Sequence, residues 1–298
     1  MSILNIKTEF PKALDDVIGF YSRKGITVKT PVSLRKSDKP ILAIMQIYIH
    51  KNKEGISQQE LMHKVFDYQI IAEFLDVSVS EEKIIDHILS KEKINNDEYK
   101  TEYAEITYHD ILIRMLKNNT APEKFFRDAL SHEIWHLIES ENGLFRNVID
   151  EGTATYAMNV HQDTLYKLYY TYYRTNKTGK IKSFNELKYE YCAAIIRNKL
   201  HGSKDLQLLF DKGIREEVTK EYKKDARKYS KNILSSQMEK YPWYLRSRIN
   251  EFLGIENKNP ICIADIEQSQ IYKELTINEQ NKIINTYNYL TERIHKMK

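Results

Sequence analysis

Two histidines four residues apart constrain this chain more than any other feature of its sequence. His132 and His136 flank Glu133 in the segment Ser131-His132-Glu133-Ile134-Trp135-His136. In a helix, residues four apart lie on one face, about 6 Å apart along the axis. Both imidazoles can then bind one zinc ion, and Glu133 can face a water molecule on that ion. The alternative is an amphipathic helix that carries two incidental histidines.

The residues around the motif predict the helix that it needs. Thr120 and Glu123 have the spacing of a capping box, so we expect the helix to begin near Ala121. Apolar residues at steps of three and four predict one packing face. They are Phe126, Leu130, Ile134, Leu137 and Ile138. Asn142-Gly143 is expected to end the helix.

A catalytic zinc takes three protein ligands and leaves a fourth position for water or substrate. Glu151 is the best candidate for the third ligand, because it follows a helix stop at Gly143 that lets the chain reverse. It also begins residues 151–175, which we expect to form another helix. Asp150 is interpreted as the N-cap of that helix. The alternative role for Glu151 is an acid that stabilises the helix dipole.

The two parts together, H-E-x-x-H and the later Asp150-Glu151-Gly152-Thr153-Ala154, resemble the gluzincin metallopeptidases, which include thermolysin and the zinc aminopeptidases. The resemblance covers residues 120–160. It implies that His132, His136 and Glu151 bind one catalytic Zn²⁺, with Glu133 as general base and a peptide or protein as substrate. It also implies an oxyanion-stabilising Tyr or His from the C-terminal lobe. The candidates for that role are His201, Tyr241 and Tyr244.

The chain departs from the family pattern in two respects. The interval between the motif and Glu151 is shorter than in thermolysin-like enzymes. Those enzymes also carry an Asp one turn after the ligand glutamate, which orients a ligand histidine, and here that position is Thr155. We expect the Thr155 hydroxyl or a backbone carbonyl to accept the histidine N–H instead. Since no aminopeptidase-type amine-binding motif precedes the histidines, we expect an endopeptidase.

Low Gly and Pro content and long periodic stretches favour helices. Helices are predicted over residues 10–24, 60–75, 78–92, 121–141, 151–175, 183–201, 204–211, 214–238, 242–253 and 276–298, and strands over 41–49 and 102–116. We therefore expect a predominantly helical α+β fold with a zincin-like core, a small mixed sheet before the active-site helix and a helical C-terminal lobe. A soft boundary near residue 140 divides 1–140 from 141–298, unless the two form one catalytic domain. The strand region 102–116 is a candidate edge strand for pairing with a peptide.

Charge and cysteine content limit the partners and the compartment. The net charge is only +4, with Lys and Glu mixed along the chain, so neither nucleic acid nor an anionic membrane is implied. No stretch reaches the roughly 18 apolar residues of a spanning helix, and the N-terminus lacks a leader pattern. Cys192 and Cys262 lie far apart and form no C-x-x-C motif, so we expect a cytoplasmic protein without a disulfide framework. The oligomeric state is not predicted.

Other features are interpreted without a function. His161 is expected to be a surface or core histidine, and the tyrosines between Tyr166 and Tyr173 to serve core and surface packing and not to form a binding site. The charged run from Arg215 to Lys231 is expected to be mostly a solvated helix face. Two alternatives to an active peptidase stay open. One is a zinc-stabilised scaffold that does not hydrolyse peptides. The other is a latent enzyme blocked by its N-terminal segment, although both cysteines follow the motif and so do not suggest a cysteine switch.

Overall fold

The structure is a computed structural model, and it describes residues 5–37, 45–50, 58–92, 103–144, 149–181, 183, 185–255 and 263–297. It confirms a predominantly helical α+β fold with a small mixed sheet. The chain divides into two compact units. Unit 1 is formed by Met1–Met62, Ile94–Lys180 and Asn185–Tyr222, and unit 2 by His63–Lys93, Ile181–Phe184 and Lys223–Lys298. Residue 140 lies within a segment of unit 1, and the domain boundary near that residue stays a prediction.

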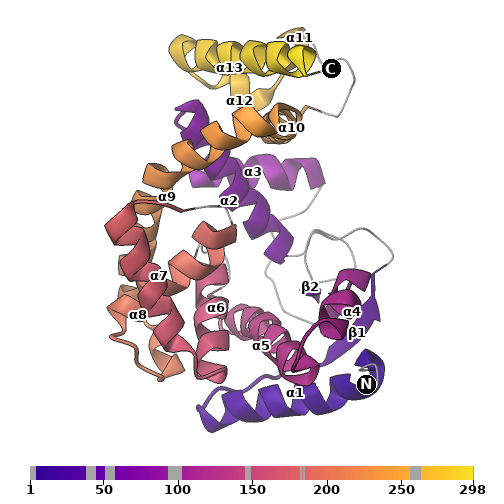
Figure 1. The fold of residues 1–298 in the computed structure, drawn as a ribbon. Coiled ribbons are helices and arrows are strands. Elements are labelled where there is room, and N and C mark those ends of the chain that lie inside the picture. Colours follow the sequence, from indigo (N-terminus) through magenta and orange to yellow (C-terminus); the bar gives the residue numbers. More distant parts are fainter. Residues whose placement is uncertain are drawn as a thin grey trace. The chain divides into compact units, whose positions relative to one another are not determined.

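Unit 1 contains the sheet and the helices that carry the candidate site (Figure 1). Its elements are α1 (Ile6–Arg23), β1 (Val32–Lys36), β2 (Met45–His50), β3 (Tyr103–Tyr108), α4 (Asp110–Lys117), α5 (Pro122–Glu141), α6 (Asp150–His161), α7 (Leu165–Thr178), the π-helix η1 (Glu186–Tyr191), α8 (Cys192–Lys199), the 3₁₀ helix η2 (Leu206–Phe210) and the start of α9 (Lys212–Lys240). Helix α5 packs against α1, α6 and β2, so it lies at the centre of the unit.

The sheet has the strand order β1-β3-β2, with β3 parallel to β1 and antiparallel to β2. Ile47 of β2 pairs with Ile106 of β3, and both side chains are fully buried. The predicted strand over 41–49 is confirmed in part as β2, while residues 41–44 lie outside the described residues. The prediction of an edge strand within 102–116 is wrong, because β3 has a neighbour on each side. Among the described strands, the edges are β1 and β2.

The second half of the predicted strand region 102–116 is a helix, α4. Leu112 and Leu116 lie four residues apart, and both are buried. An apolar pair at this spacing lies on one helix face, but in a short stretch the same residues also fit an alternating strand pattern. Periodicity alone could not distinguish the two.

Helix α5 has the predicted packing face and the predicted end. The five apolar residues expected to pack are all at most 1% exposed, and Gly143 adopts a left-handed conformation with φ of 66° after the last turn. The predicted capping box is wrong. Ala121 precedes the first helical residue, and no side chain caps the helix there.

The region predicted as one helix over 151–175 is two helices, α6 and α7. The chain turns at Asp163, whose φ of 57° is left-handed and interrupts the helix. Helix α6 packs tightly on α8. A β-carbon on Gly152 would lie 2.3 Å from Sγ of Cys192, so only glycine fits there. The residue after Glu151 therefore sets how closely α6 approaches α8.

Unit 2 is helical in its described part. It contains α2 (Gln58–Leu75) beyond its first turn, α3 (Glu81–Glu92), most of α9, α10 (Pro242–Leu253), α11 (Ile263–Glu267), α12 (Gln270–Lys273) and α13 (Ile277–Lys296). The last helix, α13, begins with a capping box in which Thr276 and Glu279 bond reciprocally. Helix α3, predicted from residue 78, begins at Glu81, and Ser80 accepts a hydrogen bond from the backbone N–H of Lys83.

Candidate metal centre

The structure brings the three predicted ligands together inside unit 1. Helix α5 presents His132 and His136 on one face, with ring centroids 5.0 Å apart. The first turn of α6 presents Glu151 to the same point. Its Oε2 lies 3.2 Å from Nε2 of His132 and 3.7 Å from Nε2 of His136. The three ligand atoms lie within 4.8 Å of one another.

The distances from the Glu151 oxygen to the two histidine nitrogens fit a small tetrahedral ion. Ligand atoms about 2.1 Å from such an ion are about 3.4 Å from one another. The two distances from the Glu151 oxygen lie on either side of that value. Two imidazole nitrogens and one carboxylate oxygen also form a set that suits zinc. The His132 side chain is 12% exposed, against 1% for His136 and 6% for Glu151, so the site is accessible from the His132 side.

Glu133 joins the motif helix to the sheet. Its Oε2 accepts a hydrogen bond of 2.9 Å from the backbone N–H of Ile47 in β2. The side chain is buried, and burial raises its pKa above the usual range for a carboxyl group, with Glu151 acting in the same direction. His132, His136 and the Ile47 N–H oppose that shift. Glu133 is therefore held in a fixed position beside the ligands.

The surroundings of the ligands are rich in buried negative charge. Glu133, Glu139, Asp150 and Glu151 are each at most 7% exposed, and only two of them bind the guanidinium of Arg215. Burial alone would lower the pKa of His136, but Glu151, Glu133 and Glu139 raise it to about 9. A cluster of carboxylates is costly to bury in a dry core. A divalent cation at the three ligand atoms would offset this charge, so the residues present fit a metal ion.

A carboxylate that the sequence analysis missed lies behind His136. Glu139 Oε2 is 3.9 Å from His136 Nδ1, and the Glu139 side chain is fully buried. Its other oxygen accepts hydrogen bonds from Arg215 Nη1 at 2.8 Å and from Thr153 Oγ1 at 2.7 Å. The i,i+3 spacing from His136 could have indicated Glu139. Nothing in the local sequence pointed to Arg215.

Three expectations near the site are corrected. Asp150 is not an N-cap, because Ile149 precedes the helix, and Asp150 Oδ1 instead accepts a hydrogen bond from Arg215 Nη2 at 3.0 Å. Thr155 is buried, and in the described part of the chain its hydroxyl makes no hydrogen bond to a ligand histidine. Arg215 is 5% exposed, so it does not belong to the solvated face expected for the run that it begins.

The candidates for an oxyanion-stabilising residue stay predictions. His201 is exposed in the turn after α8, and Tyr241 and Tyr244 are exposed in unit 2. Sequence reasoning did not consider Tyr189, which lies on η1. Its ring centroid is 5.7 Å from that of His132, and its side chain is partly exposed. The π-helical turn displaces this part of the chain from a regular helical register, which sequence periodicity does not anticipate.

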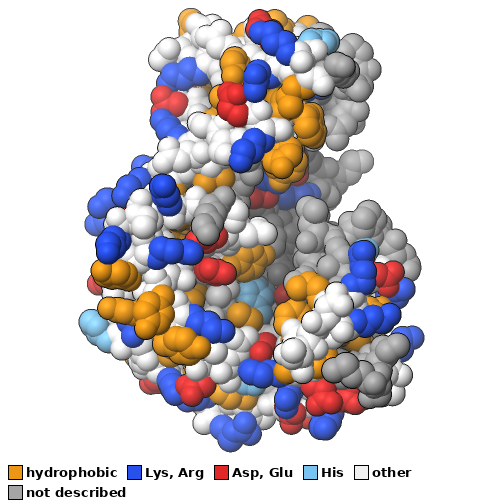
Figure 2. Space-filling view, in the orientation of Figure 1, with side chains coloured by type: hydrophobic (Ala, Val, Ile, Leu, Met, Phe, Trp, Pro, Cys, Tyr) orange, Lys and Arg blue, Asp and Glu red, His pale blue; other side chains and the backbone are white. Residues whose placement is uncertain are grey.

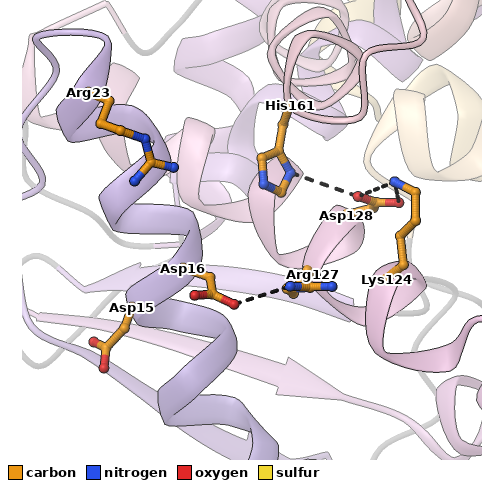
Figure 3. Close-up of a pocket in the computed structure, with 7 residues that line it drawn as sticks. All are labelled: Asp15, Asp16, Arg23, Lys124, Arg127, Asp128 and His161. Atoms are coloured by element: carbon orange, nitrogen blue, oxygen red, sulfur yellow. Dashed lines mark hydrogen bonds and ion pairs between the residues drawn. The ribbon is translucent and has the colours of Figure 1, made fainter.

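A second, polar pocket of about 430 Å³ opens on unit 1 away from the triad residues (Figure 3). It is lined by Asp15, Asp16 and Arg23 of α1, Lys124, Arg127 and Asp128 of α5, and His161 of α6. Ion pairs within the pocket join Arg127 to Asp16 and Lys124 to Asp128. His161 packs edge-on against the ring of Phe20. His161 is thus part of this packing and does not join His132, His136 and Glu151.

The tyrosine-rich helix α7 is largely a surface helix. Four of its tyrosines, namely Tyr166, Tyr169, Tyr170 and Tyr173, are 48–64% exposed. Figure 2 shows hydrophobic side chains gathered over α7 and α8 on this face. Tyr172 differs. Its ring stacks on that of Tyr191, with centroids 6.3 Å apart, and its hydroxyl donates a hydrogen bond to Glu221. Helix α7 therefore carries both exposed tyrosines and a packed one.

Cys192 is a buried free thiol, and burial raises its pKa well above the usual value, so it is protonated. Cys262 lies outside the described residues. Within the described part of the chain, no helix has the length and apolar character needed to cross a membrane.

No known protein-family model, no curated protein and no solved structure matches this chain.

Proposed function

We propose that this protein is a zinc-dependent metallopeptidase of the gluzincin type, with a zincin-like core in unit 1. The observation that carries the proposal is the convergence of His132, His136 and Glu151, with Glu133 fixed beside them. A histidine-only or carboxylate-only cluster would suit many ions. Two histidines and one glutamate that leave a fourth position open are typical of a hydrolytic zinc site.

The chemistry follows from the charges at the site. Zinc, when bound, would polarise a substrate carbonyl and lower the pKa of a water molecule. Glu133 is the group that takes the proton of the attacking water and passes it to the leaving amine. Its buried position supports this role, because a raised pKa makes the carboxylate a stronger base towards the proton of the water.

The edge of β2 supports an extended peptide as the substrate. The Ile47 N–H points to Glu133 and not to β3, so Ile47 and Ile106 form a non-hydrogen-bonded pair of the antiparallel ladder. By the strand alternation, the backbone groups of Met45, Ile47 and Ile49 point away from β3, towards the side where Ile47 meets Glu133. A peptide added to this edge would run beside Glu133. We therefore propose that a peptide substrate pairs with the edge of β2 and not with β3.

Tyr189 is the residue that we propose to stabilise charge on the substrate oxygen. It is partly exposed and lies next to His132, the most accessible of the three ligands. A phenol hydroxyl can donate a hydrogen bond to a developing oxyanion.

A cytoplasmic location stays a prediction.

The direct test compares the zinc-loaded wild-type protein with Glu133→Gln on an unbiased peptide mixture, read by mass spectrometry. Gln retains an acceptor for the Ile47 N–H but cannot take a proton. We therefore expect zinc to stay bound while cleavage falls by at least about 100-fold. Glu123→Gln, on an exposed residue of the same helix, is the matched control and should cleave as the wild type does.

Two results would contradict the proposal. The first is cleavage by Glu133→Gln at the wild-type rate, which would remove Glu133 from the mechanism. The second is a wild-type protein that holds stoichiometric zinc and cleaves no peptide. That second result would favour the zinc-stabilised scaffold.

A further inference from the structure

We propose that Glu139 and Arg215 are positioning residues, which hold His136 and Glu151 in the orientation that binds metal. This inference rests on the proposed function, since it concerns the same metal site. Neither residue belongs to the H-E-x-x-H motif or to the segment that carries Glu151. Arg215 comes from α9, far from both in sequence.

The two oxygens of Glu139 have different surroundings. Oε1 accepts hydrogen bonds from Thr153 and Arg215. Oε2 is buried, has no hydrogen-bond donor among the described residues, and lies 3.9 Å from Nδ1 of His136. The bonds to Oε1 fix the carboxylate, so Oε2 is held facing the imidazole. A small rotation of the ring would bring Nδ1 within hydrogen-bonding distance of it.

This arrangement determines which imidazole nitrogen meets the metal. A proton on Nδ1 that faces Oε2 leaves the Nε2 lone pair available as a ligand. Nε2 is the nitrogen that lies 3.7 Å from Oε2 of Glu151. Glu139 thus favours the tautomer and the ring orientation that the site requires. Thermolysin-like enzymes use an Asp to orient a ligand histidine, and this chain has Thr155 at that position. Glu139 supplies the orienting carboxylate from another position.

Arg215 joins the two ligand-bearing helices. One of its terminal nitrogens binds Glu139 on α5 at 2.8 Å, and the other binds Asp150 at the start of α6 at 3.0 Å. The guanidinium also donates to the carbonyl oxygens of Leu209 and Leu144. Because Asp150 directly precedes Glu151, this fork fixes the first turn of α6 relative to His136.

A stabilising role alone would not account for burying these charges. Replacing a buried ion network with apolar residues of similar volume is often neutral or stabilising. Three ionised side chains, Glu139, Asp150 and Arg215, are nevertheless at most 5% exposed here. Orienting the ligands is a role that apolar side chains could not perform.

The test measures zinc affinity by competition with a chelator for the wild type and Glu139→Gln. Loss of a carboxylate that orients a ligand histidine is expected to weaken zinc binding by about 10–100-fold. The absorption spectrum of the cobalt-substituted protein should change as well, because it reports ligand geometry. Asp128→Asn is the matched control, since Asp128 is a buried carboxylate of the same helix that pairs with Lys124 and not with a ligand. Its zinc affinity and cobalt spectrum should match those of the wild type.

Arg215→Lys provides a second variant in case Glu139→Gln does not fold. Lysine keeps the positive charge, but a single ammonium lacks the planar fork that binds two carboxylates. We expect weaker zinc binding at a melting temperature close to that of the wild type. If the folded variants bind zinc as tightly as the wild type, the positioning role is wrong while the metal site stands. If the wild type itself binds no zinc, the proposed function fails.

Discussion

Gly152 and Cys192 are in direct contact across the helix pair α6 and α8. A β-carbon built on Gly152 would lie 2.3 Å from Sγ and 2.6 Å from Cβ of Cys192, and 3.1 Å from its carbonyl carbon. These distances are too short for any other residue. Since Gly152 follows Glu151, the contact also fixes the depth at which the third ligand is placed.

Gly152→Ala is therefore expected to lower the free energy of unfolding by about 3 kcal/mol or more, because the added methyl group overpacks a buried contact. Urea unfolding of the metal-free protein measures this. Gly19→Ala is the control. Gly19 lies in α1, and its added β-carbon would meet only the end of the Arg23 side chain, at 3.4 Å. That variant should gain up to about 1 kcal/mol from helix propensity. Equal stability of the two variants would contradict the tight packing of α6 on α8.

Tyr189→Phe tests the proposed oxyanion role. Removing the hydroxyl should lower kcat by about 10–100-fold with little change in KM, because the lost bond forms mainly in the transition state. Zinc content should not change. Tyr170→Phe, on the exposed face of α7, is the control and should leave kcat unchanged. A rise in KM at constant kcat would instead make Tyr189 a substrate-binding residue.

His161 predicts a pH dependence of stability. Burial lowers its pKa below the usual 6.5, and Lys124, Arg127 and Arg23 lower it further, while Asp128 opposes them. The unfolded chain therefore binds a proton more readily than the folded one. The stability from neutral His161 is fully present above pH 6.5 and is lost as pH falls towards the folded pKa. Unfolding measured from pH 8 to pH 5 should show a smaller loss for His161→Gln than for the wild type. Parallel curves would show that protonation of His161 is not linked to folding.

The sequence was sufficient to predict that His132, His136 and Glu151 converge, but not the contacts behind these three residues. His132, His136 and Glu151 were predicted because helical spacing places residues together, and a glycine stop followed by a second helix returns the chain. The packing face of α5 followed from the same periodicity. These are local patterns, so a single sequence contains them.

The surroundings of the three residues depend on contacts between parts of the chain that are distant in sequence. In the sequence, Arg215 is one of many charged residues in a helix. Only the fold shows that it lies between Glu139 and Asp150. The edge strand was predicted within residues 102–116 and not in β2, because strand order depends on pairing across the sheet. The break at Asp163 was missed since its left-handed conformation is a property of one residue, and the apolar pattern continues on both sides.

The most direct test of the central claim is the metal content of the purified protein, measured by elemental analysis beside Glu151→Ala and Glu123→Ala. We predict about one zinc ion per chain in the wild type and in Glu123→Ala, and a clearly lower content in Glu151→Ala. A wild-type protein that binds no zinc when zinc is supplied, or a Glu151→Ala protein with an undiminished zinc content, would contradict the assignment of this site.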